Sequence, residues 1–163
     1  MKQLLVLLVL ALVIVPVASA TFSITVTSTS PITAPGVTLN GVDQSTTFPM
    51  TISVQDTNPS TGNGWNVTAS AAAPAFGSFT LPALVVTDVT AGTCSGGGCS
   101  QPTNSIGWPI TLNGTSQKIF DAAVGTGAKG TTPLTATFQV TYPASAVAGT
   151  YTTVVTISGT RSP

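Results

Sequence analysis

The chain has 163 residues, of which only 5% are charged, and its formal net charge is zero. It has no histidine and no basic patch that would neutralise phosphates, which argues against a nucleic-acid partner and against a hydrolase with a histidine base. Solubility therefore rests on Thr, Ser, Asn and Gly, and such a surface has little charge to oppose self-association.

The first twenty residues have the three parts of a secretory signal peptide. Lys2 supplies the positive start, Leu4–Val15 is an unbroken apolar run, and Ala18-Ser19-Ala20 is a small-residue cleavage site. The run is short for a membrane anchor, since a bilayer span needs about 20 residues. We predict cleavage after Ala20 and export, leaving residues 21–163 as a single domain with a substantial core.

The mature chain opens with segments that predict strands. Thr21–Thr29 alternates apolar and polar residues, which is typical of a strand that is half buried. Pro31–Gly36 is expected to be a connector. Val37–Leu39 is expected to be a short strand, closed by a turn at Asn40-Gly41.

The segment Met50–Ala72 predicts two strands joined by a turn. Met50–Gln55 and Trp65–Ser70 both alternate with a period of two, so each run has one apolar face. Residues 56–64 are rich in Asp, Asn, Pro, Ser and Gly, which favour turns. We expect a hairpin in which Trp65 is a core anchor, because its partners in alternation are apolar.

Two cysteines, Cys94 and Cys99, flank a Ser-Gly-Gly-Gly spacer after a predicted loop at Ala71–Phe79 and a predicted strand at Leu84–Val89. In an exported chain they most simply form a disulfide that holds a loop tip. A redox pair is the alternative, but such pairs usually have two intervening residues. A metal site would need further ligands, and the chain has no histidine to supply them.

The next segment is expected to lie at a sheet edge. Ile106–Leu112 predicts a strand that contains Pro109, and proline is confined to edges because it lacks an N–H group. Trp108 beside it is the better candidate for a surface contact. Asn113-Gly114 is a hairpin signal that leads into a short strand at Lys118–Val124, followed by a glycine-rich loop.

The final segment predicts a second hairpin. Leu134–Tyr142 and Tyr151–Ser158 alternate, and Pro143–Gly149 connects them. The second strand is apolar on both faces near Val155, which favours a central position, and Tyr151 is expected to pack inward. Short strands with turns at regular spacing predict an all-β sandwich of about eight to nine antiparallel strands, Ig-like or jelly-roll-like.

Three stretches together resemble the WxL-type bacterial cell-surface domains, in a short single-domain form. They are Gly36-Val-Thr-Leu-Asn-Gly-Val-Asp-Gln, Gly62-Asn-Gly-Trp-Asn-Val-Thr-Ala-Ser, and Pro143-Ala-Ser-Ala-Val-Ala-Gly-Thr-Tyr-Thr-Thr-Val-Val-Thr-Ile. Trp65 and Tyr151 match the family signatures, while Val67 and Val155 stand where the family has leucine. The resemblance implies an exported protein that is held noncovalently on the peptidoglycan wall.

Neither a catalytic nor a cofactor site is predicted. The acids are four scattered aspartates, which we expect in turns and at strand ends: Asp43, Asp56, Asp88 and Asp121. Calcium binding by loop aspartates stays open, although no Asp-x-Asp cluster supports it. Asn66-Val-Thr and Asn113-Gly-Thr fit the glycan acceptor pattern, but in a bacterial chain we expect them to be bare.

Three functions remain as hypotheses. The first is a wall-associated surface protein whose partner is cell-wall polysaccharide or another surface protein. The second is a self-assembling, filament-like subunit that donates the strand Phe22–Val26 to the sheet edge of a neighbour. The third is a carbohydrate-binding module that uses Trp65 or Trp108 as a stacking platform.

Overall fold

The computed structural model describes residues 21–28, 32–58 and 63–161, so the predicted signal peptide and its cleavage site at Ala20 lie outside the described residues. The described chain has strands and no helix, hence no helix that could cross a membrane, which confirms the all-β prediction. The strands are β1 (Phe22–Val26), β2 (Gln44–Asp56), β3 (Trp65–Ala71), β4 (Ala75–Phe76), β5 (Phe79–Thr80), β6 (Val85–Ala91), β7 (Ile110–Thr111), β8 (Gln117–Ala122), β9 (Gly130–Tyr142) and β10 (Val155–Arg161).

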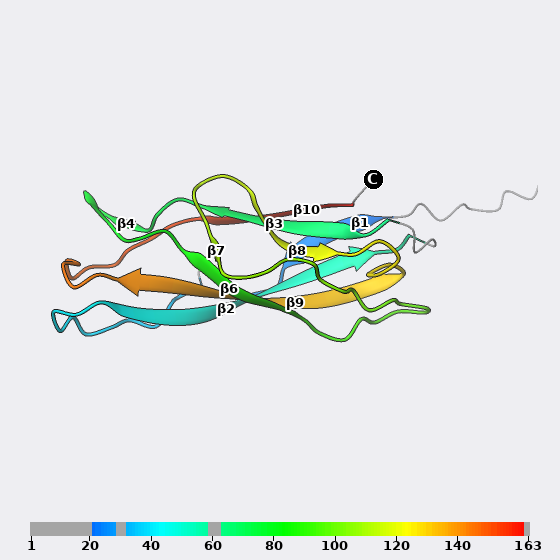
Figure 1. Cartoon of the computed structure of the whole chain (residues 1–163), viewed down its shortest axis with the longest axis horizontal. Coiled ribbons are helices and arrows are strands. Elements are labelled where there is room, and N and C mark those ends of the chain that lie inside the picture. The colour runs from blue at the N-terminus through cyan, green and yellow to red at the C-terminus, as the bar shows by residue number, and fades with distance from the viewer. Residues whose placement is uncertain (1–20, 29–31, 59–62, 162–163) are drawn as a thin grey trace, which may run out of the picture.

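The strands form two main antiparallel sheets that face each other in an elongated sandwich (Figure 1). One sheet has the order β1-β2-β9-β6-β7, and the other has the order β10-β3-β8. The short pair β4-β5 stands apart at one end of the molecule, shown on the left in Figure 1. The sandwich prediction is therefore confirmed.

The core lies between the two sheets because alternate residues of each long strand point inward. In β9, Leu134, Ala136 and Phe138 are fully buried while the residues between them are more exposed. Phe138 stacks on Phe48 of β2, with ring centroids 5.5 Å apart. A large apolar side chain that is fully buried contributes about 1.5–3 kcal/mol relative to an exposed one, so the buried cluster formed by residues of both sheets holds the sheets together.

The predicted hairpin at Met50–Ala72 is wrong, because its two strands belong to opposite sheets. β2 pairs with β9 along its whole length, from Gln44↔Tyr142 to Asp56↔Gly130, whereas β3 pairs with β10 and β8. In a sandwich the inner faces of both sheets point at each other. Alternation shows that one face of a strand is buried, but it does not show whether the next strand lies beside it in the same sheet or opposite it in the other sheet. The connection after Asp56 therefore crosses between sheets.

The other two predicted hairpins are wrong for the same reason. β9 lies in the five-stranded sheet and β10 in the three-stranded sheet, and β10 is an edge strand rather than a central one. It begins at Val155, so Tyr151 precedes it. Asn113-Gly114 does make a turn, with Gly114 at φ 83°, but the turn leads from β7 of one sheet to β8 of the other.

Three smaller predictions also need correction. Val37–Leu39 is not a strand, because no backbone partner lies beside it among the described residues. Ala71–Phe79 is not simply a loop, since it includes the end of β3 and the strand β4. Ile106–Leu112 shortens to β7, which starts after Pro109, and the predicted edge position of this strand is correct.

Candidate functional site

Trp65 is a core residue with a satisfied indole. It is fully buried, it stacks on Phe120 with ring centroids 5.4 Å apart, and its Nε1–H donates to the carbonyl of Gly127 at 2.9 Å. Gly127 has φ 74°, and a Cβ there would collide with the indole. The geometry leaves Trp65 no free face for stacking against a ligand.

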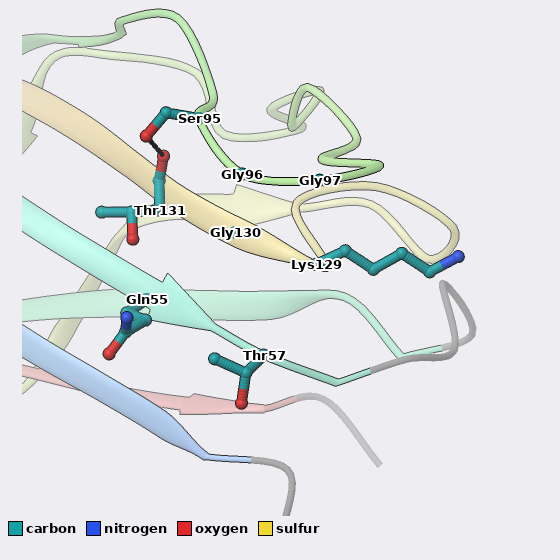
Figure 2. A pocket seen from close by; sticks show the side chains of 8 residues that line it. All are labelled: Gln55, Thr57, Ser95, Gly96, Gly97, Lys129, Gly130 and Thr131. Carbon is teal, nitrogen blue, oxygen red and sulfur yellow. Dashed lines mark hydrogen bonds between the residues drawn. The ribbon is translucent and has the colours of Figure 1, made fainter. Parts of the chain in front are cut away.

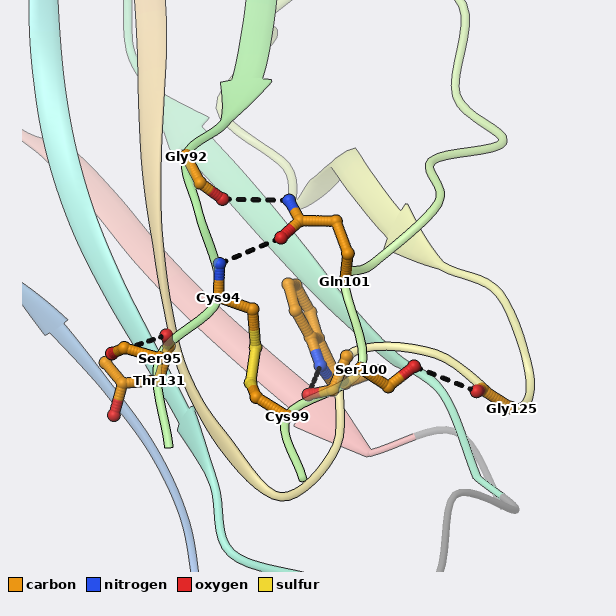
Figure 3. Close-up of a disulfide and its surroundings, with 10 residues drawn as sticks. Gly92, Cys94, Ser95, Cys99, Ser100, Gln101, Gly125 and Thr131 are labelled. Carbon is orange, nitrogen blue, oxygen red and sulfur yellow. Dashed lines mark hydrogen bonds between the residues drawn. A yellow bond between two sulfur atoms is a disulfide. The ribbon is translucent and has the colours of Figure 1, made fainter. Parts of the chain in front are cut away.

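The cysteine loop supports the loop that holds Trp65. Cys94 and Cys99 lie at disulfide distance, with Cα atoms 5.9 Å apart (Figure 3). Next to them, the N–H of Ser100 donates to Ala128 O (3.1 Å), and the carbonyl of Ser100 accepts from Gly127 N–H (2.9 Å). The cross-linked loop therefore fixes residues 125–130, which carry the carbonyl that binds the Trp65 indole.

Two of the three stretches that carry the WxL resemblance, those around Trp65 and Val155, lie side by side although they are far apart in the sequence. β10 pairs with β3 in antiparallel register, from Val155↔Ala71 to Arg161↔Trp65. Val67 is fully buried and Val155 half-buried. Tyr151 is half-buried, its hydroxyl donates to Val147 O (2.9 Å), and its ring packs edge-on against Phe76.

Trp108 is half-buried and packs against the core. Its Nε1–H donates to Ile119 O at 3.1 Å, so the polar edge of the ring is occupied. It is not among the residues that line the two hollows described below.

Each aspartate has a structural partner, and they are not brought together. The partners are Arg161 for Asp56, Lys118 for Asp121, the Thr90 hydroxyl for Asp88, and the Ala144 N–H for Asp43. Within the described ranges there is no group of three or more acidic, cysteine or histidine residues that would hold a metal ion.

The larger of the two hollows is an apolar groove of about 1310 Å³. Four segments line it, and not one lining residue is charged. We call this feature the apolar groove; its lining is Val26, Ser28, Ile32–Ala34, Gly36–Leu39, Phe48, Met50, Pro74, Leu81, Leu84, Val140, Tyr142 and Ala146–Val155.

Four of the eight large apolar side chains that are exposed in the described ranges line the apolar groove. Val26, Leu39, Val147 and Val154 are all exposed and all line it, with Val154 78% exposed. Phe76, also exposed, contacts Tyr151 at its rim. These residues make the apolar groove the candidate binding site, because covering exposed apolar surface is favourable.

A second, smaller hollow of about 550 Å³ lies between the end of β2 and the cysteine loop (Figure 2). Glycine backbone and the side chains of Gln55, Thr57, Ser95 and Lys129 line it. Two backbone hydrogen bonds between Ser95 and Thr131, at 2.8 and 2.9 Å, fix its wall. It is open to solvent and offers a ligand less apolar surface than the apolar groove does.

No protein-family model, curated protein or solved structure matches this chain. The resemblance to WxL domains therefore stays a prediction that rests on the residues quoted for it. The apolar groove is the feature that sequence reasoning missed. The sequence signal for it is a lack of charge, because residues 21–42, which supply much of its lining, include no charged residue.

Proposed function

We propose that this is an exported, non-catalytic structural protein of the cell surface that self-associates through the apolar groove. The observation that carries the proposal is the groove itself, which is uncharged, about 1310 Å³ in volume, and bordered by exposed valines and leucine. Covering such a surface is favourable at roughly 25 cal/mol per Å² of apolar area. Another copy of the same chain offers a surface of matching character.

The charge distribution supports self-association. Only 5% of the residues are charged, so two copies that approach each other meet little long-range repulsion. The edge strands β7, β8 and β10 add backbone groups that can pair with another chain. Both features favour contact between copies over binding of a strongly charged partner.

Sedimentation velocity of the purified exported protein over a range of concentrations tests the proposal. We expect concentration-dependent association that Val154→Lys weakens at least tenfold, because a charge would enter the apolar groove. Val124→Lys is the matched control, since Val124 is 70% exposed but does not line the groove. A parent protein that stays monomeric at all concentrations, or equal effects of both variants, would contradict the proposal.

Retention on the cell wall is a second candidate. The rings of Phe48, Tyr142 and Tyr151 line the same groove together with threonine hydroxyls, a combination that suits stacking and hydrogen bonding of a glycan. The resemblance to WxL domains also supports retention on the cell wall. Co-sedimentation with isolated peptidoglycan tests it, and full recovery of the protein in the supernatant would reject it.

A further inference from the structure

β1 is the edge strand of the five-stranded sheet and also contacts β10 of the other sheet. Its backbone pairs with β2 from Phe22↔Asp56 to Val26↔Ile52, and its side chains reach β10 of the opposite sheet. Phe22 and Ile24 point inward and are half-buried, whereas Ser23 and Thr25 are exposed. One short strand therefore closes this side of the sandwich.

The receiving surface is shaped for this strand. A Cβ at Gly159 of β10 would collide with Cδ1 of Ile24, so the glycine leaves the notch that Ile24 fills. The guanidinium of Arg161 lies 5.9 Å from the centroid of the Phe22 ring, within the range of a cation–π contact. We call the outer edge of Ile52–Asp56, together with Gly159 and Arg161, the β1 slot.

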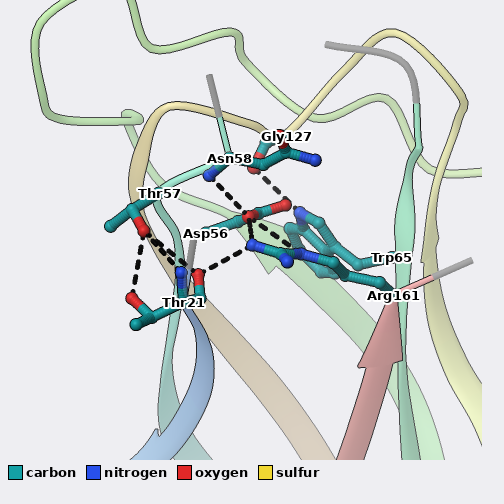
Figure 4. Close-up of polar contacts among 7 residues, drawn as sticks. All are labelled: Thr21, Asp56, Thr57, Asn58, Trp65, Gly127 and Arg161. Carbon is teal, nitrogen blue, oxygen red and sulfur yellow. Dashed lines mark hydrogen bonds and ion pairs between the residues drawn. The ribbon is translucent and has the colours of Figure 1, made fainter. Parts of the chain in front are cut away.

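The start of the strand is held by polar contacts at Thr21 (Figure 4). Its carbonyl accepts from Arg161 Nη2 (2.8 Å) and from Thr57 N–H (3.0 Å), and its N–H donates to Thr57 Oγ1 (2.8 Å). The slot thus holds the main chain of this strand and two of its apolar side chains. It would bind a β1 strand that belongs to another copy in the same way.

Residues 27, 28 and 32–39, which follow β1, contact β2 mainly through side chains, including a hydrogen bond from Thr51 N–H to Ser28 Oγ (2.7 Å). Backbone pairing with β2 ends with the bond from Thr27 N–H to Thr51 O (2.9 Å). Residues 32–39 are held to the sheet by side chains, with hydrogen bonds from Gln44 and Thr46 of β2 and a longer one, 3.5 Å, from Tyr142. Ile32 and Ala34 of this stretch are half-buried and pack against the core, so these contacts would have to form again between copies if the stretch followed β1 into a neighbour.

β1 leads directly into the apolar groove. Val26 ends β1 and also lines the groove, as do Ile32–Ala34 and Gly36–Leu39. The groove has no charged residue, and neither does the segment 21–42. A strand that enters the slot from another copy would therefore bring a linker of matching charge and polarity into the groove.

Resting on the proposed self-association, we propose that copies assemble by exchanging β1, so that the N-terminal strand of one copy occupies the β1 slot of the next. The hydrogen bonds and packing that β1 makes within its own chain form again between chains, and the net gain comes from new apolar area that a neighbouring copy covers on exposed groove residues such as Val154 and Val147. Because the strand and the slot are different surfaces, the contact is head-to-tail, which gives open chains of copies unless the rotation between copies closes a ring.

Engineered cysteines at Thr25 and Ser53 test the exchange. These residues are opposite each other in the β1–β2 register and lie on the outer face, where paired Cα atoms are about 5.5 Å apart, within reach of a disulfide. In the double variant Thr25→Cys/Ser53→Cys, oxidation should lock β1 in its own slot. We expect the locked protein to lose at least tenfold in self-association relative to the oxidised parent.

Mixing the two single variants gives the complementary measurement. If β1 is exchanged, oxidation of a mixture of Thr25→Cys and Ser53→Cys copies should produce a covalent heterodimer, while Thr25→Cys mixed with the parent should not. A locked variant that still assembles like the parent, or no heterodimer in an assembled mixture, would overturn the exchange but leave self-association standing. A parent that does not self-associate would instead refute the proposed function.

Discussion

The carboxylate of Asp56, at the end of β2, binds the guanidinium of Arg161, at the end of β10 (Figure 4). Arg161 donates to it from Nε at 3.1 Å and also from Nη2, and the Asn58 N–H donates at 3.0 Å. Asp56 is almost completely buried. Because Arg161 also holds the carbonyl of Thr21, this ion pair joins β2, β10 and the start of β1.

Removing Arg161 should therefore be costly. Arg161→Ala leaves a buried carboxylate without its counter-charge, and we expect a loss of roughly 3 kcal/mol in the free energy of unfolding, since breaking a buried pair costs about 3–5 kcal/mol and Arg161 is partly exposed. Urea unfolding measures it. Lys118→Ala, at the exposed pair with Asp121, is the control and should cost under about 1 kcal/mol. Equal losses would contradict the expectation.

The volume of Trp65 and its hydrogen bond can be separated by two substitutions. Trp65→Ala empties a large core site and should cost about 3–5 kcal/mol. Trp65→Phe keeps most of the ring but leaves the Gly127 carbonyl without its donor, so about 1–3 kcal/mol is expected. Thermal melting and peptidoglycan binding are both measured for the two Trp65 variants and for Trp108→Ala. If Trp65→Ala melted like the parent and lost only binding, Trp65 would be a ligand residue.

The cysteine pair should be closed in the exported protein and should matter modestly for stability. Thiol labelling of the denatured protein, without reductant, should find no free sulfhydryl at Cys94 or Cys99. Replacing both by alanine should cost about 2 kcal/mol, because closing so short a loop restricts the unfolded chain little. Two labelled cysteines per chain would refute the bridge.

Alternation in the sequence identified which residues face the core, but it did not identify strand partners. Trp65, Val67, Leu134 and Phe138 are all fully buried, as their spacing predicts. Their partners depend on how connections cross the sandwich, and an inner face looks the same whether its neighbour lies alongside or opposite. All three predicted hairpins failed at this step, including the one at Asn113-Gly114, whose turn signal was real.

The candidate site was less predictable still. The apolar groove is assembled from segments around Val26, Phe48, Leu84 and Tyr151, which are distant in sequence and share no motif. Each segment alone resembles ordinary strand or loop. Only the position of the crossing connections brings them together, and local spacing does not encode that position.

One buried group in β9 has no partner, and replacing it should stabilise the fold. Thr132 is 1% exposed, and its hydroxyl makes no hydrogen bond among the described residues. A buried hydroxyl without a partner costs about 1–3 kcal/mol, and valine has nearly the same shape without the polar atom. Thr132→Val should therefore raise the free energy of unfolding by about 1 kcal/mol, read as a shift of the urea midpoint.

The control is Thr135→Val, the same substitution on the exposed face of the same strand, which should change stability by less than about 0.5 kcal/mol. A gain at Thr135 equal to that at Thr132 would assign the effect to the strand preference of valine, and a loss at Thr132 would mean that its hydroxyl is hydrogen-bonded in solution.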